Sequence, residues 1–240
     1  MNGKVEEEKM GKFFRSWKGL SAFSLKIIAI ISMIIDHFAV AIYLNLPGFE
    51  KSTYICLRYI GRIAFPIYCF LLVEGFWHTG NMKKYILRMA GMAILSEIPF
   101  DLVRTGQIWD LEAQNVYFTL CIGLIVLYFI HKNAGFTEKK IFIQVVVIAL
   151  GALIANFADF DYHYMGVFTI VFFYYVRMMI SPWLRDIMGA AFLMYDIPAS
   201  LAMIPIHLYN GKRGFDCKVF FYFIYPVHLL IFGLIRIFWL

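Results

Sequence analysis

Long apolar stretches recur along almost the whole chain, and each has about the length of a membrane-crossing helix. A helix needs about 20 mostly apolar residues to cross the hydrocarbon core of a bilayer. Runs of this kind predict eight spans, with the seventh the least well defined: 22–44, 54–77, 85–103, 115–131, 141–157, 164–180, 183–207 and 217–239. The pattern therefore predicts an all-α, polytopic transmembrane helical bundle, with residues 22–240 as a single domain after a basic N-terminal segment, 1–21.

Basic residues mark alternate connections between the expected spans. They occur in the N-terminal segment, in the loops near 78–84 and 132–140, and beside 177–185. Cytoplasmic loops carry an excess of Lys and Arg, so we expect the N-terminus in the cytoplasm and a multi-pass protein of the cell membrane. Lys212 and Arg213 disagree, because eight spans would place them outside. Either the region 183–207 is broken or re-entrant, or these two bases serve a site.

Composition supports a membrane class and excludes several others. Hydrophobic residues make up 62% of the 240 residues and charged residues 16%, against roughly 45–50% and 25% in soluble domains. This excludes a water-soluble enzyme, a nucleic-acid binder and a disordered chain. The four cysteines show no metal-ligand spacing, and we expect no metal.

Ionisable residues inside the expected spans are the candidates for function. A charge deep in a bilayer costs roughly 2.5–3.5 kcal/mol on insertion scales, and such residues usually face the bundle interior. Lys26 and His37 lie eleven residues apart, which is about three helical turns, so they share a face roughly 16 Å apart. Asp36 points about 100° away from His37 and cannot orient it.

Two further pairs each share one helix face. Arg58 and Arg62 are four residues apart, and two guanidinium groups on one stripe need an anion, such as a phosphate or facing carboxylates. Glu97 and Asp101 have the same spacing around Pro99. One interpretation is a structural salt bridge between these two pairs. The residues alone fit either an enzyme or a transporter with a polar, partly basic interior and a histidine base.

Several sequence segments resemble the TraX family. They cover most of residues 25–240 and are listed in chain order: Leu25-Lys26 through Ile35-Asp36-His37, Arg58-Tyr59-Ile60-Gly61-Arg62-Ile63-Ala64-Phe65-Pro66 with Glu74-Gly75, Ser96-Glu97-Ile98-Pro99-Phe100-Asp101, Asn115 with Thr119, Tyr209 to Gly214, and Phe223 to Leu229. The namesake of that family acetylates the N-terminus of a conjugative pilin. The family is also grouped with multi-pass membrane acyltransferases, whose first span carries a basic residue and a histidine spaced like Lys26 and His37.

The resemblance implies an acyl-CoA-dependent membrane acetyltransferase. Acetyl-CoA would be the donor, and an amine or hydroxyl of an unidentified acceptor, on a protein N-terminus or a sugar, would receive the acetyl group. On this hypothesis His37 is the base or acyl acceptor, and Glu97 or Asp101 orients it. Lys26, Arg58 and Arg62 hold the CoA phosphates, and Arg58 and Arg62 can also stabilise an oxyanion. The residues that line the acceptor site are Asp36, Asn115, Tyr225 and His228.

Two other classes use the same residues differently. A transporter or channel would use the buried ions as a substrate or proton path. Inverted repeats would favour it, and the sequence shows no convincing internal repeat. A non-catalytic assembly factor for a surface structure would tolerate the loss of His37. All three classes share the lipid bilayer as their surroundings, and none needs nucleic acid.

Overall fold

The computed structural model describes residues 19–177 and 181–240, and the regular elements within these ranges are helices. This confirms the all-α prediction. In the described part of the chain, four helical segments are long and apolar enough to cross a membrane: Ala22–Asn45, Lys51–His78, Glu138–Phe157 and Lys218–Trp239. The predicted count of eight spans is not confirmed. Most of the expected N-terminal segment, residues 1–18, lies outside the described residues.

The helices follow the expected apolar runs closely, except over residues 182–208 in the last quarter of the chain. They are α2 (Ala22–Ala41), η1 (Tyr43–Asn45), α3 (Lys51–Gly61), α4 (Ala64–His78), α5 (Met82–Arg104), α6 (Val116–Lys132), α7 (Glu138–Phe157), α8 (His163–Val176), α9 (Pro182–Phe192), η2 (Leu193–Asp196), α10 (Ile197–Ser200), α11 (Met203–His207) and α12 (Lys218–Trp239). Asn81 and Asn115 cap α5 and α6, since each side chain accepts from a backbone N–H in the first turn.

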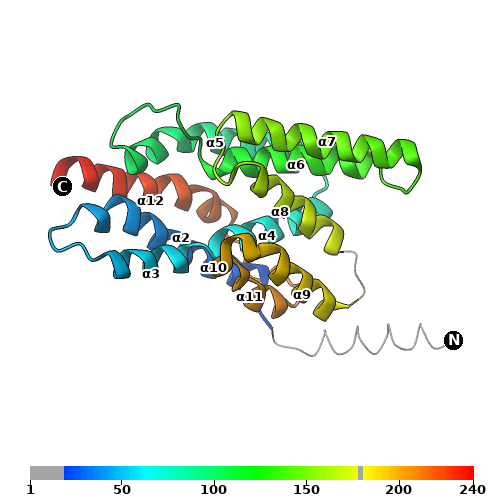
Figure 1. Cartoon of the computed structure of the whole chain (residues 1–240), viewed down its shortest axis with the longest axis horizontal. Coiled ribbons are helices and arrows are strands. Elements are labelled where there is room, and N and C mark those ends of the chain that lie inside the picture. Colours follow the sequence, from blue (N-terminus) through cyan, green and yellow to red (C-terminus); the bar gives the residue numbers. More distant parts are fainter. Residues whose placement is uncertain (1–18, 178–180) are drawn as a thin grey trace.

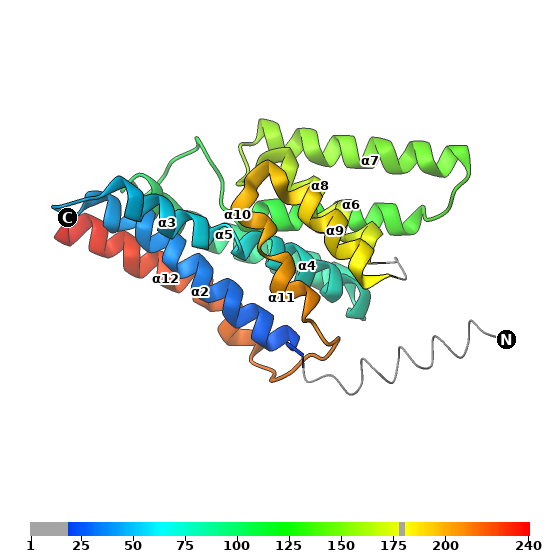
Figure 2. The same ribbon diagram turned by 60° about the horizontal axis from the view of Figure 1, so that its bottom comes forward.

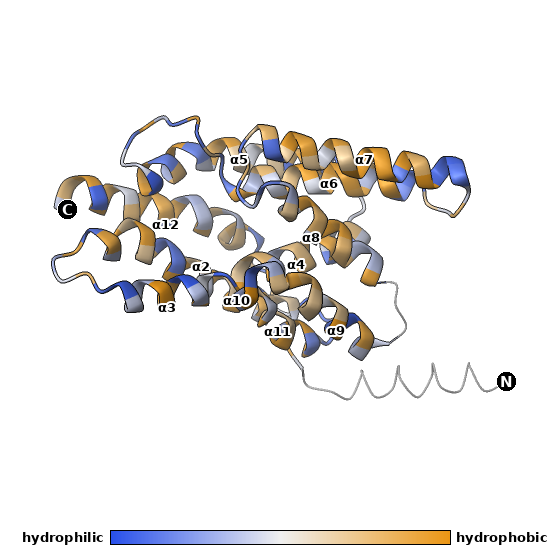
Figure 3. Ribbon diagram, viewed as in Figure 1, coloured by the Kyte–Doolittle hydropathy of each residue, from blue (hydrophilic) through white to orange (hydrophobic). Residues whose placement is uncertain are grey.

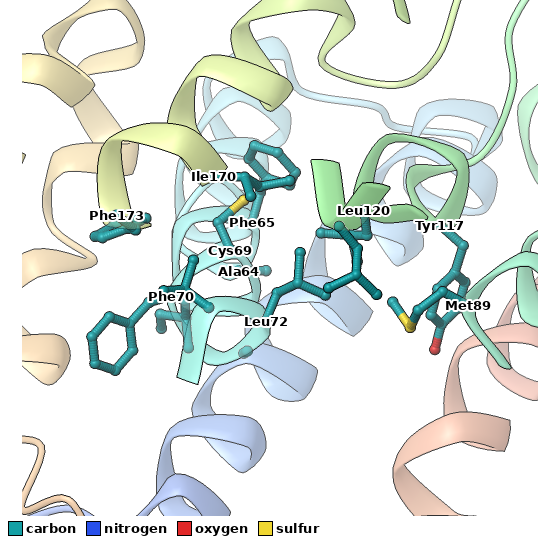
Figure 4. Close-up of a cluster of buried hydrophobic side chains, with 14 of the residues drawn as sticks. Ala64, Phe65, Cys69, Phe70, Leu72, Met89, Tyr117, Leu120, Ile170 and Phe173 are labelled. Atoms are coloured by element: carbon teal, nitrogen blue, oxygen red, sulfur yellow. The ribbon is translucent and has the colours of Figure 1, made fainter. Parts of the chain in front are cut away.

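Two groups of helices meet around α4. Figures 1 and 2 show α2 and α12 side by side with α3 along α2, and α6, α7 and α8 on the other side of the molecule. Buried apolar side chains join the groups, as Figure 4 shows for Phe65 and Cys69 of α4 and Ile170 of α8. Phe70 of α4 also meets Phe173 of α8 edge to face, with ring centroids 5.8 Å apart. The core is therefore one apolar layer with α4 at its centre.

The second apolar run is broken where α3 ends and α4 begins. α3 ends at Gly61, where a Cβ atom would clash with the side chain of Asp36 on α2. Ser32 of α2 donates to the carbonyls of Ile60 and Gly61, at 2.5 and 3.1 Å, and so satisfies the end of α3. Pro66 then lies in the first turn of α4, where a missing N–H costs nothing. The break holds the backbone around residue 62 against α2.

Residues 182–208 form a bent hairpin in place of the predicted seventh span. The chain passes through α9 and η2 to a tip at Asp196, and returns through α10 and α11. The two arms meet again where Nδ1 of His207 lies 2.5 Å from Oδ2 of Asp186. Just beyond, the carbonyl of Leu208 accepts from the N–H of Leu20 at 2.7 Å. The hairpin therefore starts and ends at the end of the bundle where α2 begins.

This geometry resolves the conflict over Lys212 and Arg213. The carbonyl of Lys212 accepts from the N–H of Ala22 at 2.8 Å, so these bases lie beside the start of α2. The last turns of α4 and α8 reach the same end, where Arg177 pairs with Glu74 at 2.5 Å and Tyr209 packs on Phe70. Of the alternatives that the sequence left open, the structure selects a broken segment.

Candidate functional site

The two histidines singled out in the first and last apolar runs lie in direct contact. Nδ1 of His37 on α2 lies 2.6 Å from Nε2 of His228 on α12, with the ring planes within 15° of each other. The contact exists because α2 and α12 run side by side, although 191 residues separate the two positions. His228 is 5% exposed. The sequence proposed His228 as a lining residue and did not pair it with His37.

The hydrogen bonds around this pair define its tautomers. Nδ1 of His228 lies 2.6 Å from the carbonyl of Ile224, which can only accept, so this nitrogen carries the proton. In a neutral ring Nε2 of His228 then accepts, and Nδ1 of His37 donates to it. The free acceptor nitrogen of the two histidines is therefore Nε2 of His37. Among the described residues no carboxylate hydrogen-bonds either ring, and the described hydrogen-bond partner of His37 is His228, not the predicted Glu97 or Asp101.

Arg58 and Arg62 each face a carboxylate from another part of the fold. Arg58 forms an ion pair with Asp36 of α2, one residue before His37. Nε of Arg62 lies 3.3 Å from Oδ2 of Asp196, at the tip of the 182–208 hairpin. Of the anions considered from the sequence, the structure supplies carboxylates. They are not Glu97 and Asp101, because the end of α3 faces α2 and the hairpin. We call Asp36, Arg58, Arg62 and Asp196 the ionic cluster.

Asp161 and Tyr162, in the turn between α7 and α8, also approach the ionic cluster, and sequence reasoning missed them. The guanidinium of Arg62 lies over the ring of Tyr162, 6.0 Å from its centroid. Burial raises the pKa of Asp161 to about 6, and the charge of Asp36 acts in the same direction. The only signal in the sequence was an acidic turn, Asp159 and Asp161, without a base. A third carboxylate therefore lies near two arginines that are already paired.

Glu97, Asp101 and Asn115 form a separate group that fixes the connection between α5 and α6. Asn115 donates its side-chain and backbone N–H groups to Oε2 of Glu97, and its Nδ2 also donates to the carbonyl of Ala93 at 2.8 Å. Oδ1 of Asn115 accepts from the N–H of Tyr117 at 3.0 Å. Oδ2 of Asp101 accepts from the N–H of Asp110 at 2.9 Å. These residues position a loop and the start of α6.

Tyr225 lies between the histidine pair and the start of α6, whereas Lys26 lies far from both. The ring of Tyr225 is 5.9 Å from His37 and 5.1 Å from Tyr117, so it fills the space between α2, α12 and α6. Lys26 lies near the other end of α2, with its ammonium 4.7 Å from the centroid of Phe221. The structure thus places His228, Tyr225 and the Asp36–Arg58 pair at or beside His37. It keeps the group of Glu97, Asp101 and Asn115 separate, and it leaves Lys26 apart, as the spacing along the helix predicted.

The comparisons with known proteins identify the family. The family model described as TraX protein matches residues 21–236. This chain belongs to the TraX family. The TraX chain is also similar to the "Probable fimbrial assembly protein FimC, serogroup H1" of Dichelobacter nodosus. The two are 30% identical over 236 residues, which cover 87% of this chain and 93% of the relative. No solved structure matches this TraX protein.

These matches correct the functional interpretation of the sequence. They confirm the TraX resemblance, but neither description names an acyl transfer, and the relative is named for fimbrial assembly. The acetyltransferase interpretation of this TraX protein is therefore wrong, and the alternative of a surface-structure assembly factor fits better. Membership of the wider acyltransferase group is not shown. The acetyl-CoA donor and the individual roles assigned to the site residues stay predictions.

Proposed function

We propose that this TraX protein is a membrane-embedded factor in the assembly of a fimbrial or pilus-type surface fibre. The observation that carries the proposal is the similarity to a fimbrial assembly protein along almost the full length of both chains. The family match, over residues 21–236, covers the helices that hold the histidine pair and the ionic cluster as well as those around them. It therefore supports a shared role for the whole domain.

The arrangement of charges is consistent with a scaffold. Arg58 and Arg62, the residues expected to hold cofactor phosphates, are paired with carboxylates of the chain itself. Each pair joins the end of α3 to a different element, namely α2 and the 182–208 hairpin. Ion pairs of this kind fix one arrangement of helices, because breaking either partner leaves a poorly solvated charge. This supports a structural role for the ionic cluster in an assembly factor.

Deleting the gene in a fibre-forming host is the direct test of the assembly role. We expect at least a tenfold loss of surface fibres in electron micrographs, while immunoblots still detect the fibre subunit in the cells. Re-expression of the full chain should restore the fibres. Unchanged fibre numbers in the deletion strain would refute the proposal, and loss of the subunit itself would place the protein in subunit stability instead of assembly.

We further propose that the protein is multi-pass and that the end of the bundle where α2 begins faces the cytoplasm. Exposed apolar side chains cover α7, including Phe142 and Leu153, and Figure 3 shows this helix as apolar along most of its length. Such a surface needs lipid around it. The bases near 83–88, 132–140, 177–185 and 212–213 lie at or next to connections at one end of the bundle, which supports the orientation.

Accessibility of single cysteines tests this orientation. The exposed positions Gln107, Phe136 and Lys212 are each replaced by cysteine in a chain whose native cysteines are changed to alanine. A membrane-impermeant maleimide should label position 107 in intact cells, and positions 136 and 212 only after the membrane is opened. Position 212 is decisive, because a full crossing by residues 183–207 would place it outside. Labelling of position 212 in intact cells would contradict the hairpin topology.

A further inference from the structure

Three cationic side chains gather where α2 and α12 begin, and they share one carboxylate. Oδ2 of Asp216 lies 2.9 Å from Nη2 of Arg213 and 3.8 Å from Nζ of Lys218. Lys26 lies on the first turns of α2 close to both, since the backbone of Arg213 bonds the N–H of Phe23 and the ammonium of Lys26 lies over Phe221, three residues after Lys218. We call Lys26, Arg213 and Lys218 the cationic cluster. Its net charge with Asp216 included is positive, and the positive ends of the α2 and α12 dipoles add to it.

The ammonium of Lys26 has no hydrogen-bond acceptor within residues 19–177 and 181–240. Its described contact is with the ring of Phe221, 4.7 Å from the centroid, and the side chain is half-buried. An ammonium group carries three donors, and a ring face satisfies them poorly. A half-buried cation beside two further cations is stabilised when an anion lies between them. The cluster is therefore short of an anionic acceptor.

Backbone contacts hold the cluster in place before any anion arrives. The carbonyl of Arg213 accepts from the N–H of Phe23 at 3.0 Å, which ties the 209–217 segment to the first turn of α2. Gly214 has φ +72°, and a Cβ atom there would lie 2.5 Å from Oγ of Ser21, so the segment lies directly on the cap of α2. Figure 2 shows this segment wrapped around the start of α2. The backbone of this segment is therefore ordered before an anion binds, which lowers the entropy cost of binding.

Apolar surface lies next to these charges. A shallow, open surface depression of about 360 Å³ is lined by Asp216, Cys217, Lys218 and Val219. On the same first turn of α12 and just before it, Phe215 and Val219 are 71% and 72% exposed. A free phosphate would make no contact with the apolar surface of Phe215 and Val219, whereas a phospholipid carries acyl chains that can pack on it. The combination favours a phospholipid over a soluble anion.

We propose that the cationic cluster binds the phosphate of an anionic phospholipid in the cytoplasmic leaflet, with the acyl chains along Val219 and the start of α12. The proposal rests on the orientation proposed above and is independent of fibre assembly. Basic residues near a membrane surface each contribute a modest, additive attraction to anionic headgroups. Three such residues on a backbone that is held against the start of α2 make a defined site from that attraction.

Lipid binding to the purified full chain tests the site. The chain is held in a neutral detergent, and native mass spectrometry compares phosphatidylglycerol with phosphatidylcholine of the same chain length. We expect a clear preference for phosphatidylglycerol, and the double variant Arg213→Gln/Lys218→Gln should weaken it about 25-fold, at about fivefold for each cation removed. Asp216→Asn removes the competing carboxylate and should strengthen binding. All three positions are exposed, so the substitutions should leave the fold intact.

A matched control separates a site from general positive charge. Lys139→Gln/Lys140→Gln removes two exposed bases from the start of α7 and should leave the lipid preference unchanged. An equal loss in that control, or equal binding of both lipids by the wild type, would overturn the proposal. Inorganic phosphate added in excess should not displace the lipid, and full displacement would assign the site to a soluble anion instead. Lipid binding is measured on the purified protein, whereas the assembly role is tested by fibre counts in the deletion strain. Failure of one proposal therefore does not imply failure of the other.

Discussion

Arg58→Met is expected to destabilise the protein by about 3 kcal/mol, because it strands the carboxylate of Asp36 between α2 and α3. Oδ1 of Asp36 already has no hydrogen-bond partner among the described residues, so the ion pair is the main stabilising contact of this carboxylate. For a chain of this size the loss corresponds to a fall of about 6–12 °C in the melting temperature. Thermal unfolding in detergent, followed by circular dichroism, measures it.

The double variant Asp36→Asn/Arg58→Met distinguishes a lost charge pair from lost packing. It removes both charges together, so most of the stability should return. Lys139→Met removes an exposed cation from α7 and should change the stability by less than about 0.5 kcal/mol. If the double variant were as unstable as Arg58→Met, packing of the arginine stem would be the cause, and the ion pair would lose its structural role.

The single substitution Asn115→Ala is expected to lower the free energy of unfolding by about 3 kcal/mol, measured by the same thermal unfolding. The substitution removes the cap of α6, worth about 1 kcal/mol, and takes the side-chain donor away from the carboxylate of Glu97, which costs roughly 1–3 kcal/mol more. The bond from the backbone N–H of residue 115 to Oε2 of Glu97, at 3.3 Å, is kept. Asn115 is 0% exposed and Glu97 is 9% exposed, so water cannot replace these bonds fully. Glu97→Gln, which keeps an acceptor for Asn115, should lose less.

Asn81→Ala is the matched control for the capping part alone. Asn81 caps α5 as Asn115 caps α6, with its side chain accepting from the N–H of Lys84 at 2.9 Å, but it is exposed and bonds no carboxylate. Its loss should cost about 1 kcal/mol. Equal effects of the two substitutions would show that the bond between Asn115 and Glu97 adds nothing to the stability of α6.

Much of the helical architecture and the list of polar residues could be predicted from the sequence. Apolar runs long enough to cross a bilayer predict helices, because the backbone of a lipid-exposed segment must satisfy its own hydrogen bonds. The ionisable residues in those runs stood out as costly, and most of them do lie between helices. The helical spacing placed Lys26 and His37 on one face and separated their environments correctly.

The partners of these residues were not predictable, and neither was the path of residues 183–207. Hydropathy describes each segment by itself, so an apolar stretch that folds back at Asp196 resembles one that crosses. Arg58 and Arg62 required anions, but only the break at Gly61 and the position of the hairpin decide which carboxylates they meet.

The sequence by itself thus determined that this is an all-helical membrane protein with charged and histidine residues inside it. The tertiary structure alone decided that His37 bonds His228, that Asp36 and Asp196 neutralise the two arginines, and that Lys212 and Arg213 lie beside the start of α2. The physical reason is that helix formation depends on local hydrogen bonds and burial, whereas pairing depends on which helix faces meet. That packing joins residues up to 191 positions apart, and no local pattern records it.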